Sequence, residues 1–318
     1  MIDTTQTSTS PDGVVVAVRG LEKRFRDIVA VRGVDFDVAA GEMFGIVGPD
    51  GAGKTTILRM LAGVLPPDAG DASIHGVSVV RDPEGVKQRT AYMAQRFGLY
   101  EDLTVRENIS FYADLYRVPR AHRPARLDRL YAFSQLGPFR DRLVGNLSGG
   151  MKQKASLCCA LIHQPEVLLL DEPTFGVDPI SRRDLWLILY EMVAEGVTIV
   201  VSTSYLDEAE RCDRVAMLYE GRVLALDSPA ALAAAHPGTL LSVPVRGDRS
   251  VRDRVRNLAG VRHAWLFGDD VHIAIDPAAP LPDRAAFAAA GVDAADLRTI
   301  EPGLEDVFLA LTAAGHVG

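Results

Sequence analysis

The octapeptide GPDGAGKT, from Gly48 to Thr55, restricts the fold of this 318-residue chain more strongly than any other stretch. It fits the pattern G-x-x-x-x-G-K-[ST] at every defined position. A short apolar run at residues 44–47 precedes it, and apolar residues at helical spacing follow it until Pro66 and Pro67 stop the helix. Strand, glycine-rich loop and helix is the context that separates a phosphate-binding loop from a glycine-rich turn with a chance lysine.

The residue types in this loop suit a bound polyphosphate. Glycines let backbone N–H groups curl around phosphate oxygens, and the start of the following helix favours an anion. Lys54 is expected to reach the β- and γ-phosphates, and the Thr55 hydroxyl is expected to hold Mg²⁺. The predicted nucleotide contacts in the loop are Gly48, Asp50, Gly51, Ala52, Gly53, Lys54, Thr55 and Thr56.

A second polar cluster follows the apolar run at residues 167–170. The run ends in Asp171, Glu172 and Pro173, as when a buried parallel strand delivers carboxylates to the ligand-binding edge of a sheet. Asp171 is expected to hold Mg²⁺ through water, and Glu172 to polarise an attacking water molecule. The alternative is an acidic turn after a strand with no further role.

Two isolated residues admit two interpretations each. Phe25 could stack on an adenine ring, although an aromatic residue here is also suited to the core. Gln95 follows a short predicted strand at residues 91–94 and could coordinate Mg²⁺ or position water, but a lone glutamine is equally a surface amide. The residues themselves leave both questions open.

The stretch from about residue 96 to 163 is predicted to form an inserted helical subdomain. Thr104 and Glu107 have the spacing of a capping box at a helix start. Ser148 is predicted to cap a second helix, whose Gly149 and Gly150 leave the backbone approachable by an anion. Taken alone, Ser-Gly-Gly is also a common turn.

Composition sets limits on compartment and partners. The net charge of −8 gives no general attraction to nucleic acid. The three cysteines lack metal-ligand spacing, which predicts a reduced, cytoplasmic chain. There is no apolar run of about 18 residues and no signal peptide, so work at a membrane requires another polypeptide to supply the span. Residues 1–13 are polar and predicted to be a disordered tail.

The predicted organisation is α/β, with a nucleotide-binding domain at residues 14–237 and an accessory domain at residues 238–318. The second domain has the pattern βαββαβ followed by a helix, which predicts a small α+β, ferredoxin-like fold. Pro244 lies in its first strand, which is therefore expected to be an edge strand. No residue in this domain has catalytic spacing.

The motifs together resemble those of one family. The phosphate loop, the Gln95 segment, the signature at residues 147–151 and the sequence Leu-Asp-Glu-Pro at residues 170–173 are similar to the nucleotide-binding subunit of an ABC transporter. The C-terminal stretch at residues 303–312 is similar to the tail of bacterial export ATPases of the daunorubicin-resistance and multidrug-efflux type. The resemblance therefore extends over the chain from about residue 14 onward.

The resemblance implies a mechanism. Two such subunits would sandwich two ATP molecules head to tail, so that Ser148, Gly149 and Gly150 face a nucleotide held mainly by the partner. Phe25 becomes the adenine-stacking residue, and Gln95 the metal and coupling glutamine. The loop at residues 176–178 would cross the dimer interface. ATP-driven closure would then pull on membrane permease subunits, placing the chain on the inner face of the cell membrane.

Three positions depart from the family pattern. Ser204 stands where a histidine normally contacts the γ-phosphate, Asp50 stands where asparagine is usual, and Lys154 where arginine is common. Loss of a positioned catalytic group slows a reaction by about 10²–10⁴-fold. One hypothesis is an asymmetric dimer, in which this chain has a slow site and completes a competent site on a partner that carries the histidine. The alternative is a homodimer in which Ser204 suffices.

Other function classes are a soluble ABC ATPase of translation or DNA repair and a regulatory module that binds ATP without hydrolysing it. The first typically has two fused nucleotide domains or a long coiled-coil insertion, which this sequence does not show. A module that only binds ATP does not need Glu172, which is predicted to polarise water for hydrolysis. The transported substrate, whether a drug, a lipid or a polyketide-like compound, is chosen by membrane subunits and cannot be read from these residues.

Overall fold

The computed structural model describes residues 13–96 and 98–315, which form two compact units. The first unit extends to Leu226 and the second begins at Asp227, which differs from the predicted boundary between residues 237 and 238. The difference arises because α8 (Pro229–Ala234) packs against α11 (Leu304–Gly315) and so groups with the second unit. The tail predicted to be disordered lies outside the described residues, except for Gly13.

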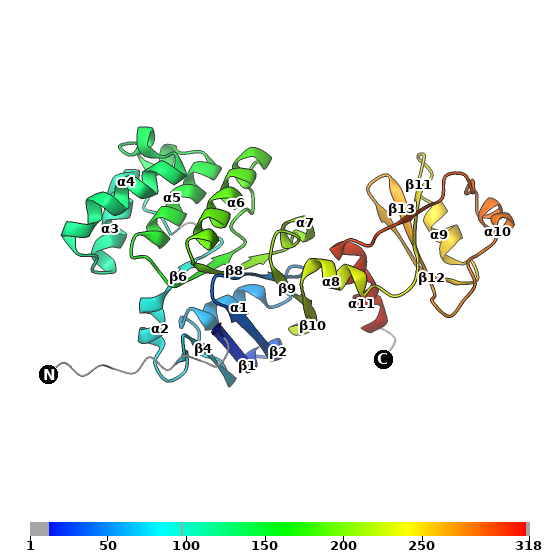
Figure 1. The fold of residues 1–318 in the computed structure, drawn as a ribbon, viewed down its shortest axis with the longest axis horizontal. Helices are drawn as coiled ribbons and strands as arrows, with labels where there is room; N and C mark the ends of the chain where they lie inside the picture. The colour runs from blue at the N-terminus through cyan, green and yellow to red at the C-terminus, as the bar shows by residue number, and fades with distance from the viewer. Residues whose placement is uncertain (1–12, 97, 316–318) are drawn as a thin grey trace. The chain divides into compact units, whose positions relative to one another are not determined.

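A six-stranded sheet forms the centre of the first unit (Figure 1). Its strand order is β10-β9-β3-β8-β7-β6, and β3 pairs in parallel with both β8 and β9. Every residue of β3, β7 and β8 is buried, as expected of apolar parallel strands covered on both faces. The strands are β3 (Met43–Val47), β6 (Thr90–Met93), β7 (Val167–Asp171), β8 (Thr198–Thr203), β9 (Arg214–Tyr219) and β10 (Arg222–Asp227).

Parallel pairing determines where the polar residues meet. Since β3, β6, β7 and β8 run in one direction, their carboxyl ends lie at one edge of the sheet. The phosphate loop follows β3, Gln95 follows β6, Asp171 ends β7 and Ser204 follows β8. The helices associated with this sheet are α1 (Lys54–Leu61), α2 (Pro83–Arg89), α6 (Pro179–Ala194) and α7 (Leu206–Ala209).

The helix after the phosphate loop is shorter than its apolar pattern predicts. It ends at Leu61, and Gly63 adopts a φ of +63° just beyond it. Val64 is one of the apolar residues at helical spacing and would lie on the buried face of a longer helix. Because α1 ends before it, Val64 is 59% exposed. A left-handed glycine is a common helix terminator, and here it acts before Pro66 is reached.

A second, antiparallel sheet has the order β2-β1-β4-β5 and carries Phe25. Register shifts within β1 let its pairing with β2 continue through Gly20 as far as Phe25. Phe25 ends β1 opposite Ile28, so it belongs to a strand rather than to a connection. The strands are β1 (Val14–Phe25), β2 (Ile28–Ala39), β4 (Ala69–Ile74) and β5 (Val77–Ser78).

The inserted subdomain is helical, as predicted, and its helices gather on one side of the central sheet (Figure 1). The capping box of Thr104 and Glu107 is present at the start of α3, and Ser148 accepts a hydrogen bond from the Met151 N–H at the start of α5. Its helices are α3 (Val105–Leu115), α4 (Arg123–Ser134) and α5 (Gly149–Leu161), with short 3₁₀ turns η2 (Arg120–His122), η3 (Gly137–Phe139) and η4 (Val144–Asn146).

The second unit has its own hydrophobic core and a four-stranded antiparallel sheet, ordered β12-β13-β11-β14. The expectation of an edge position for the first strand is wrong, because β11 lies between β13 and β14. Its proline is tolerated because β14 pairs only with Leu240–Ser242 and stops short of Pro244. The remaining elements are β11 (Leu240–Pro244), α9 (Val251–Arg256), β12 (Val261–Phe267), β13 (Asp270–Ile275), α10 (Arg284–Ala289) and β14 (Arg298–Ile300).

Among residues 13–96 and 98–315, no helix is long and apolar enough to cross a membrane. The three cysteines are free and buried.

A candidate nucleotide-binding and hydrolysis site

A cavity of about 430 Å³ opens at the carboxyl edge of the central sheet. It collects most of the site residues predicted from the sequence, although they come from segments far apart in the chain. The residues that line it are Phe25, Ala30, Asp50, Gly51, Gly53, Lys54, Thr55, Thr56, Gln95, Glu172 and Phe175.

Two glycines of the phosphate loop are required by close backbone approach. A Cβ at Gly48 would lie 2.1 Å from the Leu218 carbonyl oxygen, and one at Gly53 would lie 2.4 Å from the Ala30 carbonyl oxygen. Gly53 also has a φ of +108°, which side chains rarely adopt. Neither position therefore has room for a side chain, and the loop leads directly into the N-terminus of α1, which favours an anion.

Lys54 is almost fully buried at the base of the cavity. Its ammonium group donates to the carbonyl oxygens of Gly48 at 2.8 Å and Pro49 at 3.1 Å, and to the Ser204 hydroxyl at 2.9 Å. It also pairs with the Glu172 carboxylate at 3.0 Å. A phosphate entering the cavity would compete with Glu172 for this cation.

Asp171 is surrounded by hydroxyl donors. Oδ1 accepts from Thr55 and Ser202, each at 2.9 Å, and Oδ2 accepts from the Tyr92 hydroxyl at 3.1 Å. Burial, reinforced by the charge of Asp171, raises the pKa of Tyr92 to about 12, so this phenol remains a donor at neutral pH.

The Thr55 and Asp171 oxygens suit a hard cation that completes its shell with phosphate oxygens and water, as Mg²⁺ does. Within the part of the chain that the structure describes, no group of three or more His, Cys, Asp or Glu residues could hold a metal unaided.

Glu172 lies between three polar side chains. Its Oε1 accepts from Ser204 at 2.8 Å and its Oε2 accepts from the Gln95 amide at 3.1 Å. Ser204 Oγ is also 3.3 Å from Asp50 Oδ1, so its single hydroxyl hydrogen is shared between two carboxylates. The structure thus places Glu172, Gln95, Ser204 and Lys54 within one connected network.

The signature residues lie apart from this cavity. Ser148, Gly149 and Gly150 open α5 and line none of the cavity around Lys54. Their neighbours are the segment around Gly176 and the start of α6, where Asp178 caps the helix. The signature therefore contributes no residue to the cavity at the chain's own phosphate loop.

Phe25 lines the cavity and is 46% exposed, with the Lys23 ammonium 5.8 Å from its ring centre. This exposure separates the two interpretations of the residue, because a core aromatic would be covered. An exposed ring beside a phosphate loop is available for stacking on a base.

Several residues of the network are absent from the sequence predictions. Tyr92 and Ser202 hold Asp171, and Thr174 donates to Glu208, which is only 1% exposed. Glu208 reads in the sequence as an acidic residue of a helix start, and no pattern marks it as buried. Its partners come from three separate segments, which only the fold brings together.

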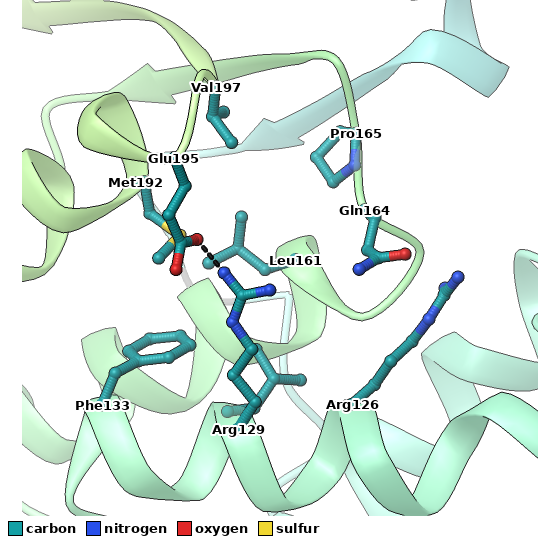
Figure 2. A pocket seen from close by; sticks show the side chains of 10 residues that line it. Arg126, Arg129, Phe133, Leu161, Gln164, Pro165, Met192, Glu195 and Val197 are labelled. Carbon is teal, nitrogen blue, oxygen red and sulfur yellow. Dashed lines mark ion pairs between the residues drawn. The ribbon is translucent and has the colours of Figure 1, made fainter.

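A second crevice, of about 220 Å³, lies between α4, the end of α5 and the end of α6 (Figure 2). Its walls are mainly apolar, and an ion pair between Arg129 and Glu195 spans it. No residue of the phosphate loop and neither Asp171 nor Glu172 lines it, so it is separate from the nucleotide site.

The parallel sheet, the phosphate loop at its edge and the carboxylates after β7 define a P-loop nucleotide-binding protein. Comparison with known proteins narrows this class. The family model described as ABC transporter matches residues 31–175.

Curated relatives cover nearly the whole chain. The probable multidrug ABC transporter ATP-binding protein YbhF of Escherichia coli is 45% identical over 93% of this chain. The Nod factor export ATP-binding protein I of Burkholderia lata is 37% identical over 92% of this chain and 95% of its own length. The daunorubicin resistance ATP-binding protein DrrA3 of Streptomyces coeruleorubidus is 35% identical over 93% of this chain and 95% of its own length. This chain spans 52% of the length of YbhF.

Solved structures agree on the fold. An ATP-binding subunit of an ABC transporter superimposes with a TM-score of 0.64 at 32% identity, covering 69% of this chain and 92% of that one. A dimeric ATP-binding cassette bound to ADP and phosphate gives 0.61 at 24% identity, covering 67% of this chain and 98% of that one. The chain belongs to the family of ABC transporter ATP-binding proteins, and its nucleotide is ATP.

Proposed function

We propose that this chain is the ATP-hydrolysing subunit that drives a membrane exporter. The observation that carries the proposal is the single network joining Lys54, Glu172, Gln95 and Ser204 at the phosphate loop. It contains a phosphate-binding cation and a carboxylate suited to polarise water. The export direction is supported by the multidrug, Nod factor and daunorubicin relatives.

ATP binding follows from the cavity. The triphosphate lies along the phosphate loop, with its β- and γ-phosphates at Lys54 and its adenine on the exposed face of Phe25. Thr55 and Asp171, with Gln95 nearby, would hold a Mg²⁺ ion, which would neutralise phosphate charge when bound. Entry of the γ-phosphate displaces Glu172 from Lys54 and leaves its carboxylate beside the attacking water.

A second ATP-binding subunit is needed to complete each ATP site. The signature at Ser148, Gly149 and Gly150 lies outside this chain's own cavity, which suits contact with a nucleotide held by the partner. The loop at residues 176–178 crosses to that partner. The structural relative described as a dimer bound to ADP and phosphate supports this arrangement for the fold.

The subunit is proposed to act at the cytoplasmic face of the cell membrane with permease subunits, which dock near Gln95 and the helical subdomain. Tyr100 is 50% exposed there. Residues 238–318 are proposed to be a ferredoxin-like accessory domain, because their βαββαβ order and sheet order β12-β13-β11-β14 suit that fold. Copurification with a membrane protein distinguishes this proposal from a soluble ABC ATPase.

Hydrolysis in this chain's own site is proposed to be slow. A serine hydroxyl is short and neutral, and Ser204 already contacts Lys54, Glu172 and Asp50. If Ser204 supports hydrolysis only poorly, the chain is expected to pair with a second ATPase that carries the histidine. If Ser204 supports hydrolysis well, a homodimer is expected.

Steady-state ATP hydrolysis by the purified chain decides between these arrangements, with Glu172→Gln as the blank and Ser204→His alongside. We expect a low wild-type rate and a gain of about 10²-fold or more in Ser204→His, since positioned catalytic groups contribute about 10²–10⁴-fold. A brisk wild-type rate that is lost in Glu172→Gln and unchanged in Ser204→His would instead establish a self-sufficient homodimer. ATP binding without hydrolysis in both wild type and Ser204→His would favour the regulatory module.

A further inference from the structure

Glu208 is a buried carboxylate to which the proposed mechanism gives no role. It lies in α7 with 1% of its surface exposed. A buried carboxylate is costly unless donors surround it. Here two hydroxyl donors and one ion-pair partner come from three different segments of the chain, and two of those segments carry the proposed hydrolytic residues.

The first contact holds the loop that carries Glu172. The Thr174 hydroxyl lies 2.6 Å from Glu208 Oε1 and 2.8 Å from Oε2, and Thr174 is itself 1% exposed. Thr174 is two residues beyond Glu172. The Thr174 carbonyl oxygen accepts a hydrogen bond from the Val177 N–H at 3.1 Å. The same threonine therefore anchors both Glu172 and the loop at residues 176–178.

The second contact holds the segment that carries Ser204. The Thr203 hydroxyl donates to Glu208 Oε2 at 2.9 Å and accepts from the Tyr205 N–H at 3.0 Å. Ser204 lies between these two residues, so its backbone is fixed on both sides. The position of its hydroxyl, 2.8 Å from Glu172, depends on this segment.

The third contact reaches α6. The Arg182 guanidinium lies 3.4 Å from Glu208 Oε1 and is stacked over the Tyr205 ring, 4.5 Å from its centre. Arg182 is in the first turn of α6, four residues after Asp178, which caps that helix. One carboxylate thus joins the end of β8, the loop after β7 and the start of α6.

We propose that Glu208 is a positioning residue for ATP hydrolysis, which sets the distance between Glu172 and Ser204 and ties both to the loop at residues 176–178. The inference rests on the proposed function, because it assumes that Glu172 acts on water. Misplacement of a reacting group by about 1 Å can cost about 10²-fold in rate. Glu208 contacts no residue of the phosphate loop in the described contacts, so nucleotide binding is expected to persist without it.

The test uses the full-length chain with Ser204→His as the active background. In that background we expect Glu208→Gln and Thr174→Val to lower kcat by about 10–10²-fold, with the KM for ATP changed less than about threefold. Thr174→Ser keeps the hydroxyl and is expected to retain kcat. Glu42→Gln is the matched control, because Glu42 is a buried carboxylate before β3, hydrogen-bonded to the Ala39 N–H and paired with Arg214.

Amide hydrogen exchange provides a readout that does not depend on hydrolysis. We expect Glu208→Gln to increase exchange in residues 174–178 and 203–205 together, while Glu42→Gln leaves both segments unchanged. Unchanged exchange in those segments, or a loss of kcat that Glu42→Gln reproduces, would overturn the inference. If no variant with Glu172 intact hydrolyses ATP, the proposed function fails, and the exchange pattern still decides the role of Glu208.

Discussion

At the scale of single residues, the site is determined by which side chains share a partner. Lys54 and Ser204 both contact Glu172, and Thr55 and Ser202 both contact Asp171. These shared contacts make the network compact, because each carboxylate is satisfied by groups from different strands. Substitution at one position is therefore expected to affect its neighbours as well.

Gly150 illustrates a residue constrained by packing within its own chain. A Cβ there would lie 2.2 Å from Ser181 Oγ and 2.3 Å from Ser181 Cβ. We expect Gly150→Ala to lower the free energy of unfolding by about 1–3 kcal/mol, the usual cost of overpacking, measured by chemical denaturation.

Gly149→Ala is the matched control for this substitution, since the nearest atom to its Cβ would be the Gly176 carbonyl oxygen at 4.0 Å. Adding Ser181→Gly to Gly150→Ala should recover part of the lost stability. If Gly149→Ala and Gly150→Ala have the same free energy of unfolding, α5 and α6 move apart without loss of stability and the prediction is wrong.

At the scale of elements, the contact between the helical subdomain and the central sheet contains a titratable group. His163 follows α5, stacks on Tyr116 with ring centres 3.8 Å apart, and has Nε2 3.3 Å from the Thr90 carbonyl oxygen. Burial lowers the pKa of His163 below its usual 6.5, and Arg126 acts in the same direction, whereas the bond to Thr90 opposes it.

The lowered pKa has a definite consequence for stability. Because the unfolded chain binds the proton more readily, the contribution of neutral His163 is fully present above about pH 6.5 and is lost as the pH falls through the folded pKa. We expect His163→Gln to flatten the dependence of the unfolding free energy on pH below 6.5. Urea denaturation at several pH values measures this, with exposed His122→Gln as the control. An unchanged slope in His163→Gln would contradict it.

At the scale of the whole molecule, each of the two units has its own hydrophobic core. ATP is expected to bind only the first unit. A ligand at about 100 times its Kd stabilises the state it binds by about 2.7 kcal/mol.

Calorimetry of the full chain carrying Glu172→Gln is therefore expected to show two unfolding transitions, with ATP raising only one. Lys54→Ala in the same chain is the control, because loss of the phosphate-binding cation should remove the shift. A single transition that ATP raises as a whole would mean that the two units unfold cooperatively.

The sequence by itself determined the family and predicted the phosphate loop and the strands that precede the loop, Gln95 and Asp171, but the predictions did not include α2 and α6. These features are local, because a glycine pattern, a capping box and an apolar strand each depend on residues that are close together in the sequence. The capping box at Thr104 and the Ser148 cap are both present as predicted. Local patterns also failed where a distant contact decided the outcome. The strand that contains Pro244 is interior because β14 pairs with its first three residues, Leu240–Ser242.

Only the tertiary structure decided which of those residues meet. Parallel pairing of β3, β7 and β8 brings Lys54, Glu172 and Ser204 together across more than a hundred positions of sequence. The fold also buries Glu208 against two hydroxyl donors and an arginine from three segments. A sequence pattern reports spacing along the chain, whereas burial and hydrogen bonding depend on spacing across the fold. The residues expected to bind phosphate could therefore be predicted from the sequence, whereas the residues that surround and position them could not.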